Sequence, residues 1–135
     1  MKTGKNKTNF ILPLIDTSQT LRLMKKTLAV NAPNEGNLTR IFERKISKLL
    51  NTKYVVATTS GTIAMFLALK ALKIGRGDEV LVPNLTFPAT INAVNLAGAK
   101  PILVDINKET LLFDLKKLRK KINKRTKAIL TVHIS

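Results

Sequence analysis

The sequence predicts an α/β fold with a mostly parallel sheet built from βαβ units, and two observations support this fold class. From Lys53 onward, short apolar runs alternate with segments of helical spacing, which is typical of parallel βαβ units. Clusters of glycine, proline and asparagine separate these runs, as expected of turns between strands and helices. We therefore expect residues 1–30 to form an N-terminal tail and helix, and residues 31–135 to form part of an α/β domain.

Two helices are expected before the sheet begins. Asp16-Thr17-Ser18 can cap a first helix that continues to about Ala29. A second helix is expected over residues 38–50, where apolar residues recur at helical spacing. Residues 1–8 form a basic tail without periodicity, and the turn-forming residues 31–37 are expected to form a loop.

The remaining elements follow from the apolar runs and the residues that bound them. Pro88 suits the first turn of a helix, Gly98 suits its end, and Asp114 can cap the lysine-rich helix that follows it. Asn107 begins a turn. We expect strands at residues 54–57, 79–82, 101–105 and 128–133, and helices at residues 62–73, 88–98 and 115–122.

The junction Ser60-Gly61-Thr62 lies where a strand-like pattern changes to a helix-like one. A helix that begins there leaves its first N–H groups without intrahelical partners and directs the positive end of its dipole outward, which favours an anion. Gly61 would let a phosphate approach the backbone, and the two hydroxyls offer further donors. The alternative is that Ser60 or Thr62 merely caps a buried core helix. These residues alone leave both interpretations open.

The composition excludes several classes of protein. A chain of 135 residues with 44% hydrophobic content is long and apolar enough for a globular core. It has no cysteine and a single histidine, His133, so neither a disulfide framework nor a metal site is expected. No apolar run approaches the roughly 20 residues of a transmembrane helix, and no signal peptide is recognised. We therefore expect a cytoplasmic protein that does not bind metal or membrane.

The net charge of +16 raises the alternative of a small basic nucleic-acid-binding module. The basic residues are 18 lysines and only 6 arginines, although bidentate phosphate recognition favours arginine. In the densest group, residues 116–127, the neighbouring apolar residues fall on one helical face and leave the lysines on the others. The pattern favours a solvated basic surface over a nucleic-acid interface.

Polar residues follow each expected strand. In an open parallel sheet, ligands bind beyond the carboxyl ends of the strands. Residues 58–62, 84–90 and 105–108 lie at these positions, and His133 ends the last strand. No helix follows that strand to cover the sheet, although both faces of a parallel sheet are normally covered. We therefore expect the chain to be the first part of a longer protein.

The ordered set of segments resembles the N-terminal part of the DegT/DnrJ family. These are fold-type I aminotransferases that use pyridoxal 5'-phosphate (PLP) and act on nucleotide-linked keto sugars. The resemblance rests chiefly on YVVATTSGT at residues 54–62, GRGDEVLVP at residues 75–83 and TFPAT at residues 86–90. It continues through shorter matches at residues 42–43, 67–69, 92–93, 97–99, 101, 104–106, 126–129 and 132–133. A lone Ser-Gly-Thr would be weak evidence for this family, but the ordered set of segments is specific for it.

The resemblance implies roles for a few residues. Ser60, Gly61 and Thr62 match the positions that hold the cofactor phosphate, and Phe87 matches the aromatic residue that stacks on the pyridine ring. Without the resemblance, a core phenylalanine would be the better interpretation of Phe87. Asp105 matches a structural strand-end position, and His133 matches a family position to which we assign no chemistry.

The resemblance also implies what the 135 residues lack. The family's lysine that forms the Schiff base and its aspartate at the pyridine nitrogen lie downstream, and none of the 18 lysines matches the anchor position. The chain is thus expected to be the N-terminal part of the large domain, inactive alone, with weak or no PLP binding. The parent is expected to be a homodimer that uses glutamate as amino donor. Another fold-type I PLP enzyme, a lyase or desulfurase, is the alternative.

Overall fold

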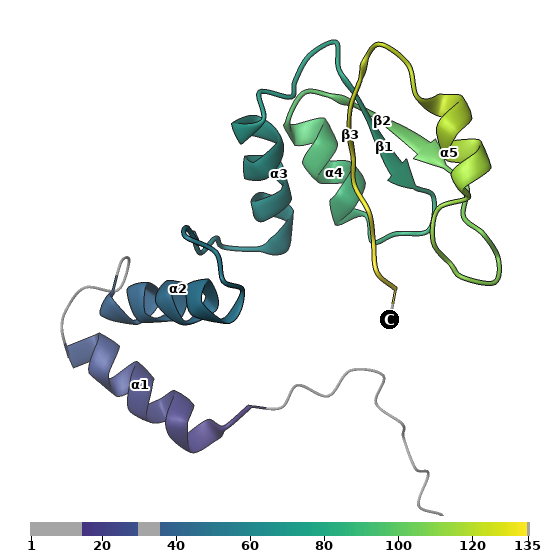
Figure 1. The fold of residues 1–135 in the computed structure, drawn as a ribbon. Coiled ribbons are helices and arrows are strands. Elements are labelled where there is room, and N and C mark those ends of the chain that lie inside the picture. Colours follow the sequence, from purple (N-terminus) through teal and green to yellow (C-terminus); the bar gives the residue numbers. More distant parts are fainter. Residues whose placement is uncertain (1–14, 30–35, 135) are drawn as a thin grey trace, which may run out of the picture. The chain divides into compact units, whose positions relative to one another are not determined.

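The elements follow one another in the order α1 (Thr17–Ala29), α2 (Asn37–Leu49), α3 (Gly61–Ala71), β1 (Glu79–Pro83), α4 (Ala89–Leu96), β2 (Lys100–Val104), α5 (Leu115–Lys121) and β3 (Thr126–Ile129) (Figure 1). This computed structural model describes residues 15–29 and 36–134. The predicted basic tail and most of the predicted loop at 31–37 lie outside the described residues. The chain divides into two units, Met1–Ala57 and Thr58–Ser135, and each is described by itself.

The first unit contains the two predicted helices, α1 at Thr17–Ala29 and α2 at Asn37–Leu49. Asp16 caps α1, because its carboxylate accepts a hydrogen bond of 3.0 Å from the Gln19 N–H. This bond lowers the pKa of the Asp16 carboxyl below its ordinary value. Neither helix contains a buried residue, so the apolar faces expected from the sequence do not form a core among the described residues.

The strand predicted at residues 54–57 is wrong, because this segment forms no regular element. Tyr54 and Val56 are 76% and 77% exposed. A side chain of α2 holds the end of this segment, since the Ala57 N–H donates to Glu43 Oε1 at 2.9 Å. High β-propensity does not suffice for a strand, since the stability of a strand comes from cross-strand pairs. Within the described residues, no neighbouring strand supplies those pairs.

The second unit contains a three-stranded sheet of order β2-β1-β3. Its strands are β1 at Glu79–Pro83, β2 at Lys100–Val104 and β3 at Thr126–Ile129. Both neighbours run parallel to the central strand β1, which confirms the predicted parallel sheet. The last strand is shorter than predicted, because its ladder ends at Ile129 and only the Leu130 N–H still bonds to β1, at Leu81 O.

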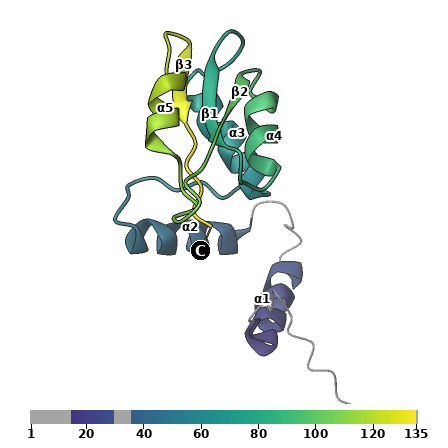
Figure 2. The ribbon, with the colours of Figure 1, turned by 90° about the vertical axis from the view of Figure 1, so that its right-hand side faces the viewer.

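Helices cover both faces of this sheet (Figure 2). Helices α3 at Gly61–Ala71 and α4 at Ala89–Leu96 pack on one face, and α5 at Leu115–Lys121 packs on the other. The alternation of side chains along β1 divides the core, with Val80 and Val82 facing α3 and α4 and Leu81 facing α5. Helix α3 is less buried than expected, since only Leu69 is fully buried in it.

The predicted ends of two helices are confirmed. Gly98 adopts a positive φ of 84° just beyond α4, and its N–H and that of Ala99 bond to the carbonyls of Asn95 and Val94. This pattern is a Schellman motif, in which glycine adopts the left-handed conformation without steric strain. Asp114 caps α5, because its carboxylate accepts from the N–H groups of Lys116 and Lys117.

A buried carboxylate fixes the start of the strand pair β1 and β3. The Glu79 side chain is 5% exposed, and both of its oxygens are bound. Arg125 Nη2 lies 2.8 Å from Oε1, and Asn123 Nδ2 donates to Oε2 at 2.8 Å. The Glu79 N–H also donates to the Arg125 carbonyl. Side chain and backbone thus hold the same end of the strand pair, just before the register shifts between Glu79 and Val80.

Replacing Arg125 by alanine should lower the free energy of unfolding by about 1–3 kcal/mol, because a buried charge then loses its ionic partner. Urea unfolding monitored by circular dichroism measures the change. Lys127→Ala is the matched control, since Lys127 is an exposed basic residue of β3, two positions after Arg125. Equal losses of stability in the two variants would contradict the role assigned to the Glu79–Arg125 pair.

Candidate functional site

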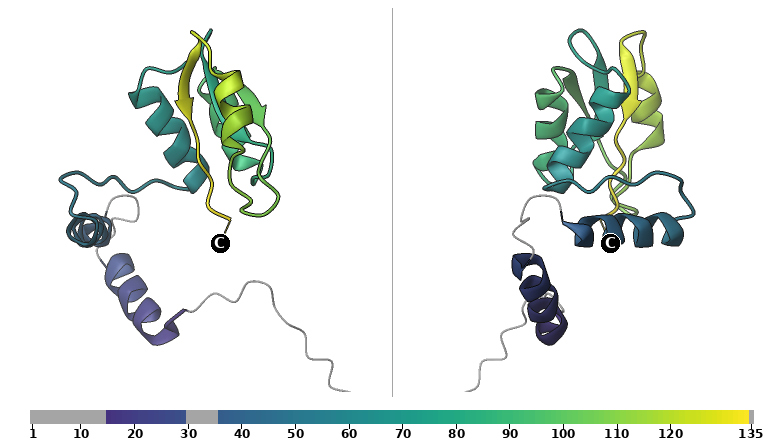
Figure 3. Two further views of the ribbon diagram at one scale, coloured as in Figure 1. Left: turned by 45° about the vertical axis from the view of Figure 1, so that its right-hand side comes forward. Right: turned by 90° about the vertical axis from the view of Figure 1, so that its left-hand side faces the viewer.

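The candidate site lies at the edge of the sheet where the parallel strands end. Helices α3 and α4 run antiparallel to β1 and β2, so both helices begin at this edge (Figure 3). The predicted phosphate-binding residues at the start of α3 and the predicted aromatic Phe87 before α4 therefore lie at the same end of the layer. This is the position at which ligands bind in open parallel sheets.

At the start of α3, a side chain of the protein binds one of the N–H groups that have no intrahelical partner. Ser60 is the N-cap, since its Oγ accepts from the Ile63 N–H at 3.3 Å and its carbonyl accepts from the Ala64 N–H at 3.0 Å. Among the described residues, no acceptor is found for the N–H groups of Gly61 and Thr62. The capping interpretation of Ser60 is thus confirmed, and two donors remain for an anion.

The space beside Gly61 is open. A methyl group placed on Gly61 would meet no atom within 4 Å, apart from its chain neighbours and its own helix. A ligand can therefore approach the backbone of the first turn closely. Two unpaired N–H groups, the positive end of a helix dipole and an unobstructed approach suit a phosphate group. The residues present therefore fit the phosphate part of PLP.

Phe87 is not a core residue in this structure. Its side chain is 78% exposed, which contradicts the interpretation as a core phenylalanine. Its carbonyl accepts from the Thr90 N–H at 3.1 Å in the turn that leads into α4. The backbone of Phe87 is thus fixed while its ring is accessible, as an aromatic residue that stacks on a ligand requires.

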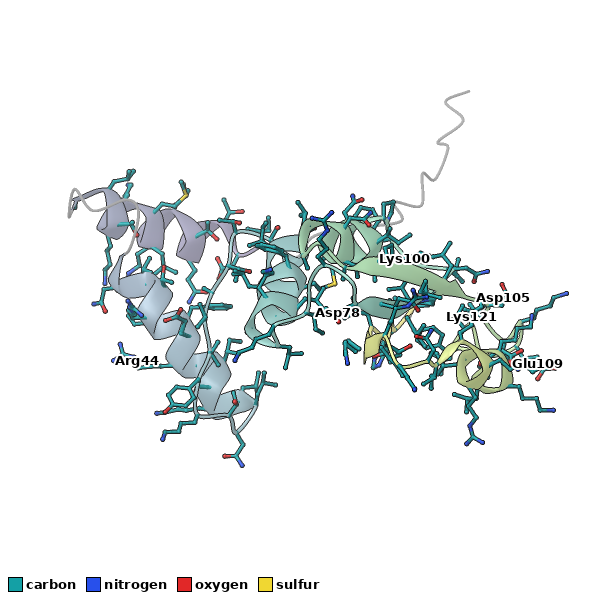
Figure 4. The ribbon with its side chains drawn as sticks, turned by 90° about the horizontal axis from the view of Figure 1, so that it is seen from above. Arg44, Asp78, Lys100, Asp105, Glu109 and Lys121 are labelled. Carbon is teal, nitrogen blue, oxygen red and sulfur yellow. The ribbon has the colours of Figure 1, made fainter. Side chains whose placement is uncertain are left out.

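Asp105 lies at the end of β2, beside α5 (Figure 4). Its Oδ1 accepts from Asn84 Nδ2 at 2.9 Å, and its Oδ2 lies 2.8 Å from Lys117 Nζ. The hydrogen bond from Lys117 lowers the pKa of the Asp105 carboxyl, and the carboxylate in turn raises the pKa of Lys117. Asp105 was expected to be structural, whereas Asn84 and Lys117 were not singled out from the sequence.

His133 lines a groove of about 770 Å³ at the same edge of the sheet. Residues 110–116 form the opposite wall, and leucine and phenylalanine side chains make up much of it. His133 is exposed and follows the end of β3, so it is not the strand residue that the sequence predicted.

Among the described helices, none is long and apolar enough to cross a membrane.

Comparison with known proteins finds a matching family and similar sequences. The model of the DegT/DnrJ/EryC1/StrS aminotransferase family matches residues 15–135. GDP-perosamine synthase of Escherichia coli O157:H7 is 42% identical over 101 residues, which are 75% of this chain and 28% of that protein. GDP-perosamine synthase of Vibrio cholerae is 40% identical over 93 residues, 69% of this chain and 25% of that protein.

Solved structures show the same fold. A protein of Streptococcus pneumoniae named as a sugar aminotransferase, solved in its PMP form, is similar with a TM-score of 0.86 and 34% identity. The similarity covers 90% of this chain and 31% of that one. NtdA of Bacillus subtilis with bound cofactor PMP has a TM-score of 0.78 and 36% identity, over 96% of this chain and 32% of its own.

The chain thus spans about a quarter to a third of the length of these relatives. The likeness extends over nearly all of this chain, and the solved relatives have the fold-type I architecture that the sequence predicted. The chain belongs to the DegT/DnrJ/EryC1/StrS aminotransferase family.

Proposed function

We propose that this chain is the N-terminal portion of a PLP-dependent aminotransferase that acts on nucleotide-linked keto sugars. The observation that carries this proposal is the pair of N–H groups at Gly61 and Thr62 that find no acceptor among the described residues, in a chain of this family. Relatives named as GDP-perosamine synthases support a nucleotide-sugar substrate, and relatives solved in PMP forms support the cofactor. Glutamate is the proposed amino donor, and the proposed parent is a cytoplasmic homodimer.

Four residues of this chain would hold the cofactor. The N–H groups of Gly61 and Thr62 would bind its phosphate, with the Thr62 and Ser60 hydroxyls as further donors. The exposed ring of Phe87 would cover one face of the pyridine. When bound, PLP supplies an electron sink and an aldehyde carbon that can carry an amino group. The residues of this chain bind and orient that group and leave proton transfer to a lysine elsewhere in the parent.

The 135 residues alone should not catalyse transamination. None of the 18 lysines matches the family's covalent anchor, and this chemistry needs a lysine that binds the cofactor and moves protons. We expect at most weak PLP binding by the isolated chain. Transaminase activity in a purified preparation of these residues would contradict this assignment.

The parent protein should retain PLP through dialysis and show a visible cofactor absorbance, which borohydride should fix covalently onto a single lysine. Peptide mapping by mass spectrometry identifies that lysine, and we expect it outside residues 1–135. With glutamate and a keto-sugar nucleotide, the parent should form the amino sugar. A parent that neither absorbs in the visible range nor retains PLP would refute the proposed function, and one that eliminates or desulfurises its substrate would favour the lyase or desulfurase alternative.

Gly61→Ala separates ligand binding from folding. The added methyl group meets open space, so the free energy of unfolding should stay the same or rise by up to about 1 kcal/mol as the unfolded chain loses freedom. PLP affinity of the parent should fall by about tenfold or more, because the methyl group occupies the path of the phosphate. Fluorescence titration with PLP measures this change. Thr59→Ala, at an exposed residue outside the proposed site, is the control, and unchanged affinity in Gly61→Ala would contradict the phosphate site.

A further inference from the structure

The loop at residues 84–88, which presents Phe87, is fixed from two sides. On the side of α4, the hydroxyls of Thr86 and Thr90 lie 2.7 Å apart, and Thr90 is buried. On the side of β1, the Asn84 N–H donates to the Val104 carbonyl at 2.9 Å, and Asn84 Nδ2 donates to Asp105. Phe87 lies between these attachments, and its exposed ring makes no contribution to the core.

Asp105 connects this loop to α5. One carboxylate oxygen binds Asn84 of the loop, and the other binds Lys117 of the helix. Lys121, one helical turn after Lys117, donates from Nζ to the Leu103 carbonyl on the same strand. Two lysines of α5 therefore hold the end of β2, and Figure 4 shows Lys121 and Asp105 on this side of the sheet.

The energetics of these contacts favour a local role over a global one. The side chains of Lys117 and Asp105 are 53% and 55% exposed, and exposed ion pairs contribute little to the stability of a whole domain. A carboxylate with a fixed donor on each oxygen nevertheless restricts both donors to one geometry. We therefore expect the Asp105 carboxylate to affect the position of the loop at residues 84–88 and not that of the adjacent β1, because the buried core already holds β1 in place.

We propose that Asp105 is a positioning residue, which links Asn84 at the start of the loop of residues 84–88 to Lys117 of α5 and so sets the place of the Phe87 ring. Its importance for the cofactor rests on the proposed function, since Phe87 is taken there as the stacking residue. The effect of Asp105 on the ordering of the loop does not depend on the proposed function. Separate experiments test the ordering of the loop and the binding of the cofactor.

Hydrogen exchange measured by mass spectrometry on this chain tests the ordering of the loop. Asp105→Ala and Lys117→Met should each speed exchange in a peptide covering residues 84–88 by about fivefold or more, while peptides of β1 and α4 keep their protection. Lys117→Arg should restore slow exchange, because it keeps the donor and the charge. Lys120→Met, an exposed lysine of the same helix, should change nothing.

Several results would overturn this part of the proposal. The first is an unchanged exchange rate at residues 84–88 in Asp105→Ala or Lys117→Met. The second is an equal increase of that rate in Lys120→Met. The third is an equal increase of the exchange rate in β1, which would show general destabilisation of the domain. If Asp105→Ala does not fold, the exchange rates of Lys117→Met and Lys117→Arg test the ordering of the loop instead. A wild-type chain without protection in β1 would contradict the fold on which the proposal depends.

Cofactor binding by the parent protein tests the consequence for Phe87. PLP affinity should fall by about five- to tenfold in Asp105→Ala, in proportion to the fraction of molecules whose loop keeps its position. Lys120→Met should bind PLP as the wild type does. If the loop exchanges faster in Asp105→Ala but PLP affinity is unchanged, Asp105 does not position the Phe87 ring for the cofactor. A wild-type parent that binds no PLP would instead refute the proposed function and leave the ordering of the loop standing.

Discussion

The burial of β1 on both faces is the constraint on which the second unit depends. Val80, Leu81 and Val82 have no exposed surface, so the strand requires a covering layer on each side and a neighbour on each edge. Because both neighbours are parallel to β1, each connection must return along a face of the sheet, as α4 and α5 do. The same geometry brings the carboxyl ends of the strands and the starts of α3 and α4 to one edge. The candidate site is thus a consequence of how the core is covered.

This edge combines rigid backbone with accessible functional groups. The N–H groups of Gly61 and Thr62 extend from a helix that its N-cap and core contacts hold in place, and the ring of Phe87 extends from a loop attached at both ends. Preorganised donors bind an anion without further ordering of the backbone, which lowers the entropic cost of binding. The site therefore needs few residues, provided that the surrounding hydrogen bonds keep them in position. Asn84, Asp105 and Lys117 supply such bonds, although none of them lies in the turn that we propose binds phosphate.

The sequence predicted those features that depend on neighbours in the chain. The apolar run at Val80–Val82, the Gly98 helix end and the Asp114 cap each follow from local chemistry, and all three are confirmed. Several features that depend on particular distant partners were missed or wrong, although the parallel sheet itself was predicted. Tyr54 and Val56 have strand propensity but no described partner strand, and the Asn84–Asp105 bond joins residues 21 positions apart through the register of β1 and β2. The four-residue spacing of Lys117 and Lys121 was the one signal that could have placed these lysines on a common face.

The first turn of α3 is the part of this chain that we propose binds phosphate. The most direct measurement is the titration of this 15N-labelled chain with inorganic phosphate and with PLP, followed through the backbone amide signals. We expect saturable shifts of the Gly61 and Thr62 amides, for whose N–H groups the described residues provide no acceptor, and much smaller shifts at Ala64, whose N–H is already bound to the Ser60 carbonyl. Shifts confined to the lysine-rich α5, or equal shifts throughout the basic surface, would show that the anion binds by charge alone and not at this turn.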